Sequence, residues 1–323
     1  MVTRETIQSA LGKCLDETDF LELPNHRRGK VRDTYEIDDK LILITTDRQS
    51  AFDRILASIP FKGQVLNQVS AFWFDRTADI VPNHVLEVPD PNVTVARKCR
   101  VIPIEFVVRG YLTGSTDTSA WTQYNRGVRT FCGNELPEGM VKNQKFEEPV
   151  LTPTTKAEEH DESISAEEIV SRGIVDGDLW ERLSSIAFSL FRRGTEIAAE
   201  HGLILVDTKY EMGINEHGEV LLIDEIHTPD SSRYWLADSY RERMAEGAEP
   251  ENIDKEFLRL WFREHCDPYH DKELPAAPDE LVTELSSRYI RLYEMITGLE
   301  FRVDTSVPIR ERIKRNCASY LPD

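Results

Sequence analysis

Three ionisable side chains follow an apolar run near the middle of the chain. The run is 203–206, and Asp207, Lys209 and Glu211 come after it at every second position. Because the side chains of a strand alternate between its two faces, all three project from the same side. Carboxylates are oxygen ligands for divalent cations such as Mg²⁺, and a lysine ammonium can neutralise charge on a transferred phosphoryl group. The pattern therefore predicts a site for a metal and a phosphate.

A second apolar run at 220–223 ends in two further carboxylates, Asp224 and Glu225. The two runs form a predicted β-hairpin whose register depends on its loop. A two-residue loop would place Asp224 opposite Lys209, but it requires positive φ at two residues that are not glycine. A three-residue loop with Gly218 in the left-handed region costs less and would place Glu225 opposite Lys209. Either register adds a carboxylate to the cluster.

An exposed ladder of salt bridges on a half-solvated sheet would contain the same residue types. Charged residues that directly follow nearly continuous apolar runs are more typical of strand ends that face a cleft. Ionisable groups with perturbed properties also gather at functional sites. We therefore interpret the segment 203–234 as the functional centre of the chain.

A basic segment near the N-terminus supplies a second candidate for phosphate binding. Gly29 would permit the close approach of a ligand, and Lys30 and Arg32 share one face of a predicted hairpin over 27–44. Two cations beside a glycine could cover a polyphosphate. The segment matches neither a P-loop nor GxGxxG, and a solvated basic strand would have the same pattern.

Three other segments carry candidate residues. Asp53 belongs to a polar cluster at 45–54, in which ordinary turn chemistry explains Asp47 and Ser50 and burial of an aromatic side chain explains Phe52. At 109–115, an arginine, two glycines and hydroxyls could bind an anion, and a simple Arg-Gly turn explains the pattern equally well. The region 122–165 is mostly predicted loop, and loops of this length are often functional.

Helices and strands must position these segments. Hydrophobic periodicity predicts helices over 64–78 and 179–201, the second of which leads into the strand at 203, and two strands within 93–108. Amphipathic helices over 257–262 and 281–297 are interpreted as packing elements without chemistry. The mixture predicts an α+β protein.

The composition restricts the possible partners. The 323 residues include 39 basic and 58 acidic side chains, and the net charge of −19 argues against nonspecific binding to nucleic acid or to an anionic membrane. No apolar run approaches the roughly 20 residues of a membrane span. Residues 1–20 are polar, and the five cysteines contain no CxxC pair. We therefore expect a cytoplasmic location, while the sequence leaves monomer or homo-oligomer undecided.

Two long motifs resemble the signatures of the SAICAR synthetase family, LVDTKYEMG at 205–213 and IDEIHTPDSSRY at 223–234. Shorter segments resemble family motifs in the same order, at 28–33, 50–53, 109–115 and 154–161. Met212 departs from the family, which more often has phenylalanine or isoleucine there. The length and the C-terminal helices resemble the longer branch of the family, of about 300 residues.

The resemblance implies an ATP-dependent ligase of purine biosynthesis. Such an enzyme joins L-aspartate to the carboxylate of CAIR, carboxyaminoimidazole ribotide, and releases ADP and phosphate, with an acyl phosphate as the economical intermediate. The implied fold is akin to ATP-grasp enzymes and kinases. ATP would lie between an N-terminal β-rich lobe and a central α+β domain, followed by a C-terminal helical region, with bounds 1–108, 109–245 and 246–323.

The resemblance also implies roles for the matching residues. The ATP phosphates would be covered by Gly29, Lys30 and Arg32. Mg²⁺ would be held by Glu211 and Asp224. Lys209 would stabilise the transferred phosphoryl group, and Asp207 would orient Lys209 or bind substrate hydroxyls. CAIR would be bound by Arg109, Ser115 and Arg233. The region that receives L-aspartate would include Lys156, Asp161 and Asp53.

Two other functions would use similar residues. Another ATP-dependent phosphotransferase, such as an inositol-phosphate or protein kinase, also combines a phosphate-binding hairpin with carboxylate-bound Mg²⁺. The sequence lacks an HRD…N loop and a DFG motif, which argues against a protein kinase. A catalytically inactive nucleotide-binding regulator would not require the complete set of charged residues, so their presence argues against this function.

Overall fold

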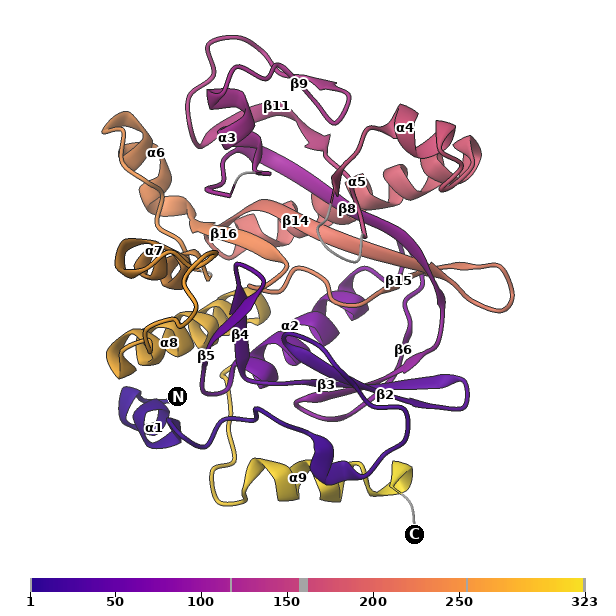
Figure 1. Ribbon diagram of the computed structural model, residues 1–323, viewed down its shortest axis with the longest axis vertical. Coiled ribbons are helices and arrows are strands. Elements are labelled where there is room, and N and C mark those ends of the chain that lie inside the picture. Colours follow the sequence, from indigo (N-terminus) through magenta and orange to yellow (C-terminus); the bar gives the residue numbers. More distant parts are fainter. Residues whose placement is uncertain (1, 117, 157–161, 254, 322–323) are drawn as a thin grey trace.

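Two antiparallel sheets form the centre of the computed structural model, which describes residues 2–116, 118–156, 162–253 and 255–321 (Figure 1). The smaller sheet has the order β1-β2-β3-β7-β6. Its strands are β1 (Arg27–Arg28), β2 (Arg32–Ile37), β3 (Lys40–Thr45), β6 (Val85–Asp90) and β7 (Val93–Arg97). Strands β2 and β3 confirm the predicted hairpin. A separate hairpin consists of β4 (Arg48–Ala51) and β5 (Arg54–Ser58).

The larger sheet has the order β13-β12-β8-β14-β15, with β11 also paired to β8 and β16 to β14. Its strands are β8 (Arg100–Leu112), β11 (Gln144–Leu151), β12 (Thr154–Thr155), β13 (Glu162–Ser163), β14 (Leu203–Ile214), β15 (Val220–Ile223) and β16 (Ser232–Leu236). A short hairpin, β9 (Thr130–Phe131) with β10 (Asn134–Glu135), lies outside it. The two long strands β8 and β14 pair along most of their length through the middle of the molecule (Figure 1).

The two long helices predicted before the C-terminal region are confirmed as α2 (Lys62–Arg76) and α5 (Gly177–Glu200). The inner face of α5 contains Leu183, Ala187 and Leu190, which are fully buried, because positions three and four apart share one side of a helix. Gly194 on the same helix permits close packing, since a Cβ there would lie 2.4 Å from the His227 ring. The helix therefore supports β14 from the face opposite the charged residues.

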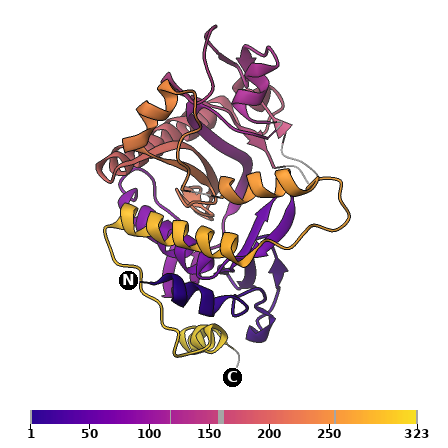
Figure 2. The same ribbon diagram turned by 90° about the vertical axis from the view of Figure 1, so that its left-hand side faces the viewer.

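The remaining helices surround the sheets. They are α1 (Arg4–Ala10), α3 (Ala120–Asn125), α4 (Ala166–Ser171), α6 (Ala237–Ala245), α7 (Glu256–His265), α8 (Asp279–Thr297) and α9 (Ile309–Asn316), with 3-10 turns at Asp19–Leu21 and Ala318–Tyr320. Figure 2 shows α7 and α8 across one side of the molecule, with α9 near the C-terminus. In the described parts of the chain, no helix is long and apolar enough to cross a membrane.

The last helix is attached to the smaller sheet by a buried ion pair. Arg312 of α9 donates to both carboxylate oxygens of Asp90, at 3.0 and 3.1 Å, and to the side chain of Asn92. Ile313 beside it belongs to the hydrophobic core of the smaller sheet. The last helix is therefore a packing element of the smaller sheet in the N-terminal half.

One of the two alternatives considered for the segment 109–115 is wrong. The Arg-Gly turn considered at 109–115 does not form, because β8 continues through Arg109 and Gly110 to Leu112. Arg109 pairs with Asp207 of β14 on one side and with Val150 of β11 on the other, so its backbone groups are used by the sheet. The predicted domain boundary after residue 108 falls inside this strand, and the three-region division stays a prediction.

Candidate active site

The β14–β15 hairpin has the register of the three-residue loop, with Gly218 at φ +81°. The sequence analysis further predicted that this register would place Glu225 opposite Lys209, and that prediction is wrong. Strand β15 ends before Asp224, and this residue has φ +67°, which turns the chain out of the sheet. As a result, a carboxylate oxygen of Asp224 lies 3.9 Å from the Lys209 ammonium.

Lys209 lies at the centre of a cluster of carboxylates. Its Nζ is 2.6 Å from Glu211 Oε1 and 2.8 Å from Glu105 Oε1. Glu105 comes from β8 and is paired directly with Glu211 of β14. The predicted alternation is confirmed here, because the Tyr210 side chain projects to the opposite face and contacts His227.

The cluster concentrates negative charge where water is scarce. Burial alone would lower the pKa of Lys209, but Glu211, Asp224 and Glu105 together hold it well above its ordinary value. Burial and the charge of Asp224 raise the pKa of Glu211, although Lys209 and Lys156 oppose them. Two carboxylates that repel one another in this way favour additional positive charge.

The glycine-containing loop lies against this cluster. The Arg32 guanidinium donates to Asp224 at 2.5 Å and lies 3.3 Å from a Glu225 oxygen. A Cβ at Gly29 would lie 2.5 Å from the Arg32 carbonyl oxygen, so a larger residue would open the tight loop. Lys30 points instead to Asp53, at 2.5 Å, in the turn between β4 and β5.

Lys156 joins the cluster from the end of β12, where its ammonium donates to Glu211. Its side chain is about one-third exposed. The sequence assigned it to the region that receives L-aspartate, together with Asp161, which lies outside the described residues. The structure thus brings Lys156 to the carboxylates of the predicted metal site.

A second group of charges surrounds Asp207. Arg109 donates to its carboxylate at 3.2 Å, and Arg233 donates to the same oxygen. Arg109 is also fixed by a 2.8 Å hydrogen bond to the Thr152 hydroxyl. Asp207 therefore lies between the two arginines predicted to bind CAIR, and its ion pairs in the described residues are with them rather than with Lys209.

Ser115 lies where α7 approaches the end of β8. Its hydroxyl donates to Glu256 at 2.5 Å, and Arg263 donates to its carbonyl oxygen at 3.0 Å. Arg259 contacts Glu256 at 3.4 Å, and Lys255 donates to the Asp230 carbonyl oxygen at 2.8 Å. A cavity of about 140 Å³ adjoins this region and is lined by Ser115, Arg233 and Glu256, among others.

Comparison with known proteins identifies the family. A family model described as SAICAR synthetase matches residues 25–275. The chain belongs to this family.

Individual relatives cover nearly the whole chain. The phosphoribosylaminoimidazole-succinocarboxamide synthase of Legionella pneumophila (strain Paris) is 59% identical over 309 residues, 95% of this chain and 99% of the relative. The chloroplastic enzyme of that name from Arabidopsis thaliana is 60% identical over 321 residues, 98% of this chain and 78% of the relative.

Solved structures of SAICAR synthetases are also similar to this chain. The SAICAR synthase from Saccharomyces cerevisiae, complexed with SAICAR, has a TM-score of 0.78 at 34% identity, with 90% of this chain and 100% of that chain covered. A SAICAR synthetase in complex with ADP, at 24% identity and a TM-score of 0.66 over 86% of this chain and 100% of that chain, shares the fold.

Family membership confirms the predicted α+β fold and the predicted activity. The chain is an ATP-dependent carbon–nitrogen ligase of purine biosynthesis that joins L-aspartate to the carboxylate of CAIR. A protein kinase and a silent regulator are thereby excluded as its main function.

Sequence reasoning missed several charged residues at the SAICAR synthetase site. Glu105 is the only ionisable residue between the two arginines of β8, and that isolation in an apolar run was its signal. In α7, Glu256, Arg259 and Arg263 recur at helical spacing, so they share one face. The sequence interpretation assigned this helix to packing alone, whereas Glu256 and Arg263 contact Ser115, a predicted site residue.

The donor chemistry suits Mg²⁺. Glu211 and Asp224 are two carboxylates within reach of one ammonium, and magnesium is commonly shared between one or two carboxylates and a nucleotide. In the described residues, no three His, Cys, Asp or Glu side chains form a cation site by themselves. A metal here would therefore need phosphate oxygens of ATP to complete its coordination.

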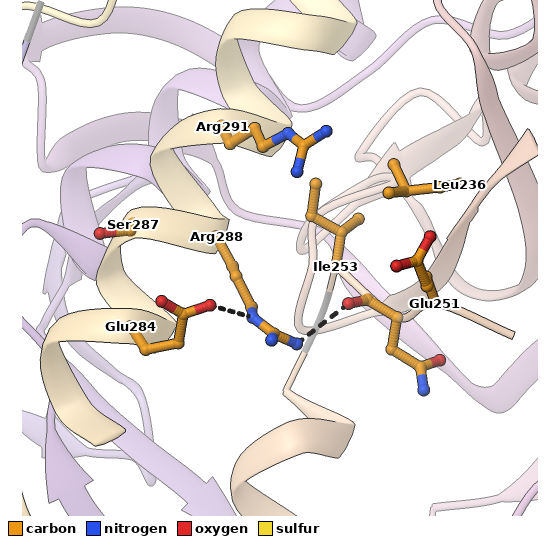
Figure 3. A pocket seen from close by; sticks show the side chains of 8 residues that line it. Leu236, Glu251, Ile253, Glu284, Ser287, Arg288 and Arg291 are labelled. Carbon is orange, nitrogen blue, oxygen red and sulfur yellow. Dashed lines mark hydrogen bonds and ion pairs between the residues drawn. The ribbon is translucent and has the colours of Figure 1, made fainter. Parts of the chain in front are cut away.

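A larger cavity, of about 320 Å³, lies away from this chemistry. It is bounded by α8 and the segment 251–253 (Figure 3). Arg288 points into it and donates to Glu284 at 2.9 Å and to the Asn252 carbonyl oxygen at 3.2 Å. Because none of the predicted site residues lines this cavity, we do not assign it to the reaction.

Proposed function

We propose that Lys209 and the surrounding carboxylates carry out the phosphoryl-transfer half of the ligation. A carboxylate oxygen of CAIR attacks the γ-phosphorus of ATP, the bond to the β–γ bridging oxygen breaks, and ADP leaves with that electron pair. The product is an acyl phosphate. This step is needed because an amine cannot displace oxide, a very poor leaving group, from the carbon of a free carboxylate.

The observation that carries the proposal is the position of the Lys209 ammonium, within 4 Å of Glu105, Glu211 and Asp224. A buried cation held in this way is preorganised to stabilise the charge that develops on a transferred phosphoryl group. Arg32 links one of these carboxylates, Asp224, to the glycine loop. This supports the assignment of Gly29, Lys30 and Arg32 to the phosphates of ATP.

Glu211 and Asp224 would hold Mg²⁺, which supplies charge neutralisation on the phosphate oxygens of ATP when it is bound. Asp224 rather than Glu225 is assigned to the metal, because Arg32 contacts both carboxylates but Asp224 is the one that lies within 4 Å of Lys209. Lys156 would leave Glu211 to the metal and turn toward substrate.

Arg109, Arg233 and Ser115 would bind CAIR. Asp207 would hold the two guanidinium groups in place, and guanidinium groups suit the recognition of an anion. The cations of α7 would add to this anion site, because Arg263 already contacts Ser115. L-Aspartate would be received near Lys156 and Asp53, with Asp161 as the further predicted residue.

In the second half-reaction the amine of L-aspartate attacks the acyl carbon. The new carbon–nitrogen bond forms, the carbon–oxygen bond to phosphate breaks, and phosphate leaves with that electron pair. The nitrogen loses one proton, which the departing phosphate can accept.

We further propose a cytoplasmic location, which is supported by five free cysteines.

Isotope transfer tests the acyl phosphate directly. CAIR labelled with ¹⁸O in both carboxylate oxygens should deliver one ¹⁸O to the released phosphate and retain the other in the amide. Mass spectrometry of both products reads the result. Phosphate without label would contradict the mechanism, and ADP release that needs a hydroxyl acceptor instead of L-aspartate would favour a phosphotransferase.

A further inference from the structure

Glu105 occupies a position that the reaction scheme above leaves without a role. It is paired directly with Glu211 across β8 and β14. Both side chains are largely buried, with 13% and 7% of their surfaces exposed. Like charges at opposed positions of a sheet repel one another, and the repulsion grows where water is excluded. The pair is therefore stable only with a cation beside both members.

Lys209 is that cation. It lies two positions before Glu211 in β14, opposite Val107 of β8, so its side chain reaches both carboxylates diagonally along the same face. The other oxygen of Glu105 accepts a 3.3 Å hydrogen bond from the Thr154 hydroxyl of β12. Because both oxygens are engaged, the orientation of the Glu105 carboxylate is fixed by neighbouring strands.

The two carboxylates that hold Lys209, those of Glu105 and Glu211, differ in their other contacts. Glu211 contacts Lys156 as well and is one of the two proposed metal ligands. When Glu211 binds a metal, its negative charge is shared between the metal and the Lys209 ammonium. Glu105 comes from a different strand, and among the described residues its side chain bonds to Lys209 and Thr154. It can hold the lysine whatever Glu211 binds.

We propose that Glu105 is the positioning residue that directs Lys209 at the transferred phosphoryl group. The inference rests on the proposed role of Lys209. Glu105 acts through the lysine and does not itself contact substrate. Its removal should leave ATP and CAIR bound but allow the ammonium to move away from the reacting oxygens.

The test begins with Glu105→Gln, which keeps the side-chain size and removes the charge. We expect kcat to fall about 10- to 100-fold, because an ångström of misplacement has effects of that order, while the KM values for ATP and CAIR stay nearly constant. Glu36→Gln is the matched control. Glu36 forms an exposed ion pair with Lys98 in the smaller sheet, and its substitution should leave kcat unchanged.

A double-mutant cycle with Lys209→Met separates positioning from a structural role. Single-turnover assays at high enzyme concentration keep the slow variants measurable. In the Lys209→Met background, Glu105→Gln should change the rate by less than about twofold, because residues that act through one another are not additive. An equal loss in both backgrounds would overturn the inference. Unchanged turnover of Lys209→Met would instead overturn the proposed function.

Lysine acetylation provides a readout independent of activity. With acetic anhydride and mass spectrometry, the labelling of Lys209 should increase several-fold in Glu105→Gln. Lys62, which is 0% exposed, serves as the internal reference and should stay protected. Equal increases at both lysines would mean that Glu105 stabilises the fold as a whole, and no increase at Lys209 would mean that it is held by other groups. Either result would contradict the inference.

Discussion

Lys209→Met gives the strongest test of the proposed active site. Methionine retains the length and the apolar stem of lysine but removes the ammonium. In the protein the Lys209 side chain is 28% exposed, and its ammonium lies within 4 Å of three carboxylates. The substitution therefore removes a largely desolvated positive charge without creating a large cavity.

The expected magnitude follows from that environment. Loss of one preorganised donor to a developing negative charge costs about 10²- to 10³-fold in kcat, or roughly 3–4 kcal/mol of transition-state stabilisation. The folded protein should also lose about 2 kcal/mol of stability, because Glu105 and Glu211 would remain opposite one another without the ammonium that contacts both, although Lys156 still contacts Glu211.

Steady-state ADP release with CAIR and L-aspartate measures the first effect, and urea unfolding measures the second. Lys98→Met is the matched control, because Lys98 forms an exposed ion pair with Glu36 remote from the cluster. It should change neither quantity appreciably. A Lys209→Met enzyme with kcat within about threefold of wild type would refute the transition-state role of the lysine.

Three further perturbations address other parts of the site and the fold. Arg233→Ala should raise the KM for CAIR at least about tenfold with a smaller effect on ATP; equal losses for both ligands would contradict the assignment. Asp224→Asn should lower the Mg²⁺ affinity measured by activity against free Mg²⁺, whereas Glu225→Gln should not; the reverse order would make Glu225 the ligand. Burial lowers the pKa of His84 to about 4, so the unfolded chain binds this proton more readily. The contribution of this histidine should lower the wild-type stability by up to about 3 kcal/mol as the pH drops from about 6.5 to about 4. Urea unfolding of His84→Gln should lose that part of the pH dependence, and identical profiles would show that the histidine is not responsible.

Local patterns predicted the parts of the fold that depend on neighbouring residues. The alternation of Asp207, Lys209 and Glu211 is confirmed, because the pleat of a strand fixes which side chains share a face. The loop with left-handed Gly218 is confirmed for a similar reason, since the φ angle that a hairpin loop demands selects glycine. The long helices followed from apolar periodicity in the same way.

The contacts that those side chains make with distant segments could not be predicted from local sequence patterns. The sequence placed Asp207 beside Lys209, whereas the structure places it between Arg109 and Arg233. It also gave no indication that Glu105 lies opposite Glu211. These contacts depend on the register between β8 and β14, which lie about 100 residues apart in the chain, and register over such separations is set by the packing of whole sheet faces.

The sequence by itself determined the residue types of the site, their side of the strand and, through its two long motifs, the family and its reaction. Only the tertiary structure decided which carboxylate faces Lys209. The left-handed turn at Asp224 removes the chain from the sheet one residue before the ladder would have delivered Glu225. The structure also brought α7 to Ser115. Local sequence fixes dihedral preference and periodicity, while contacts between distant segments depend on how the complete core packs.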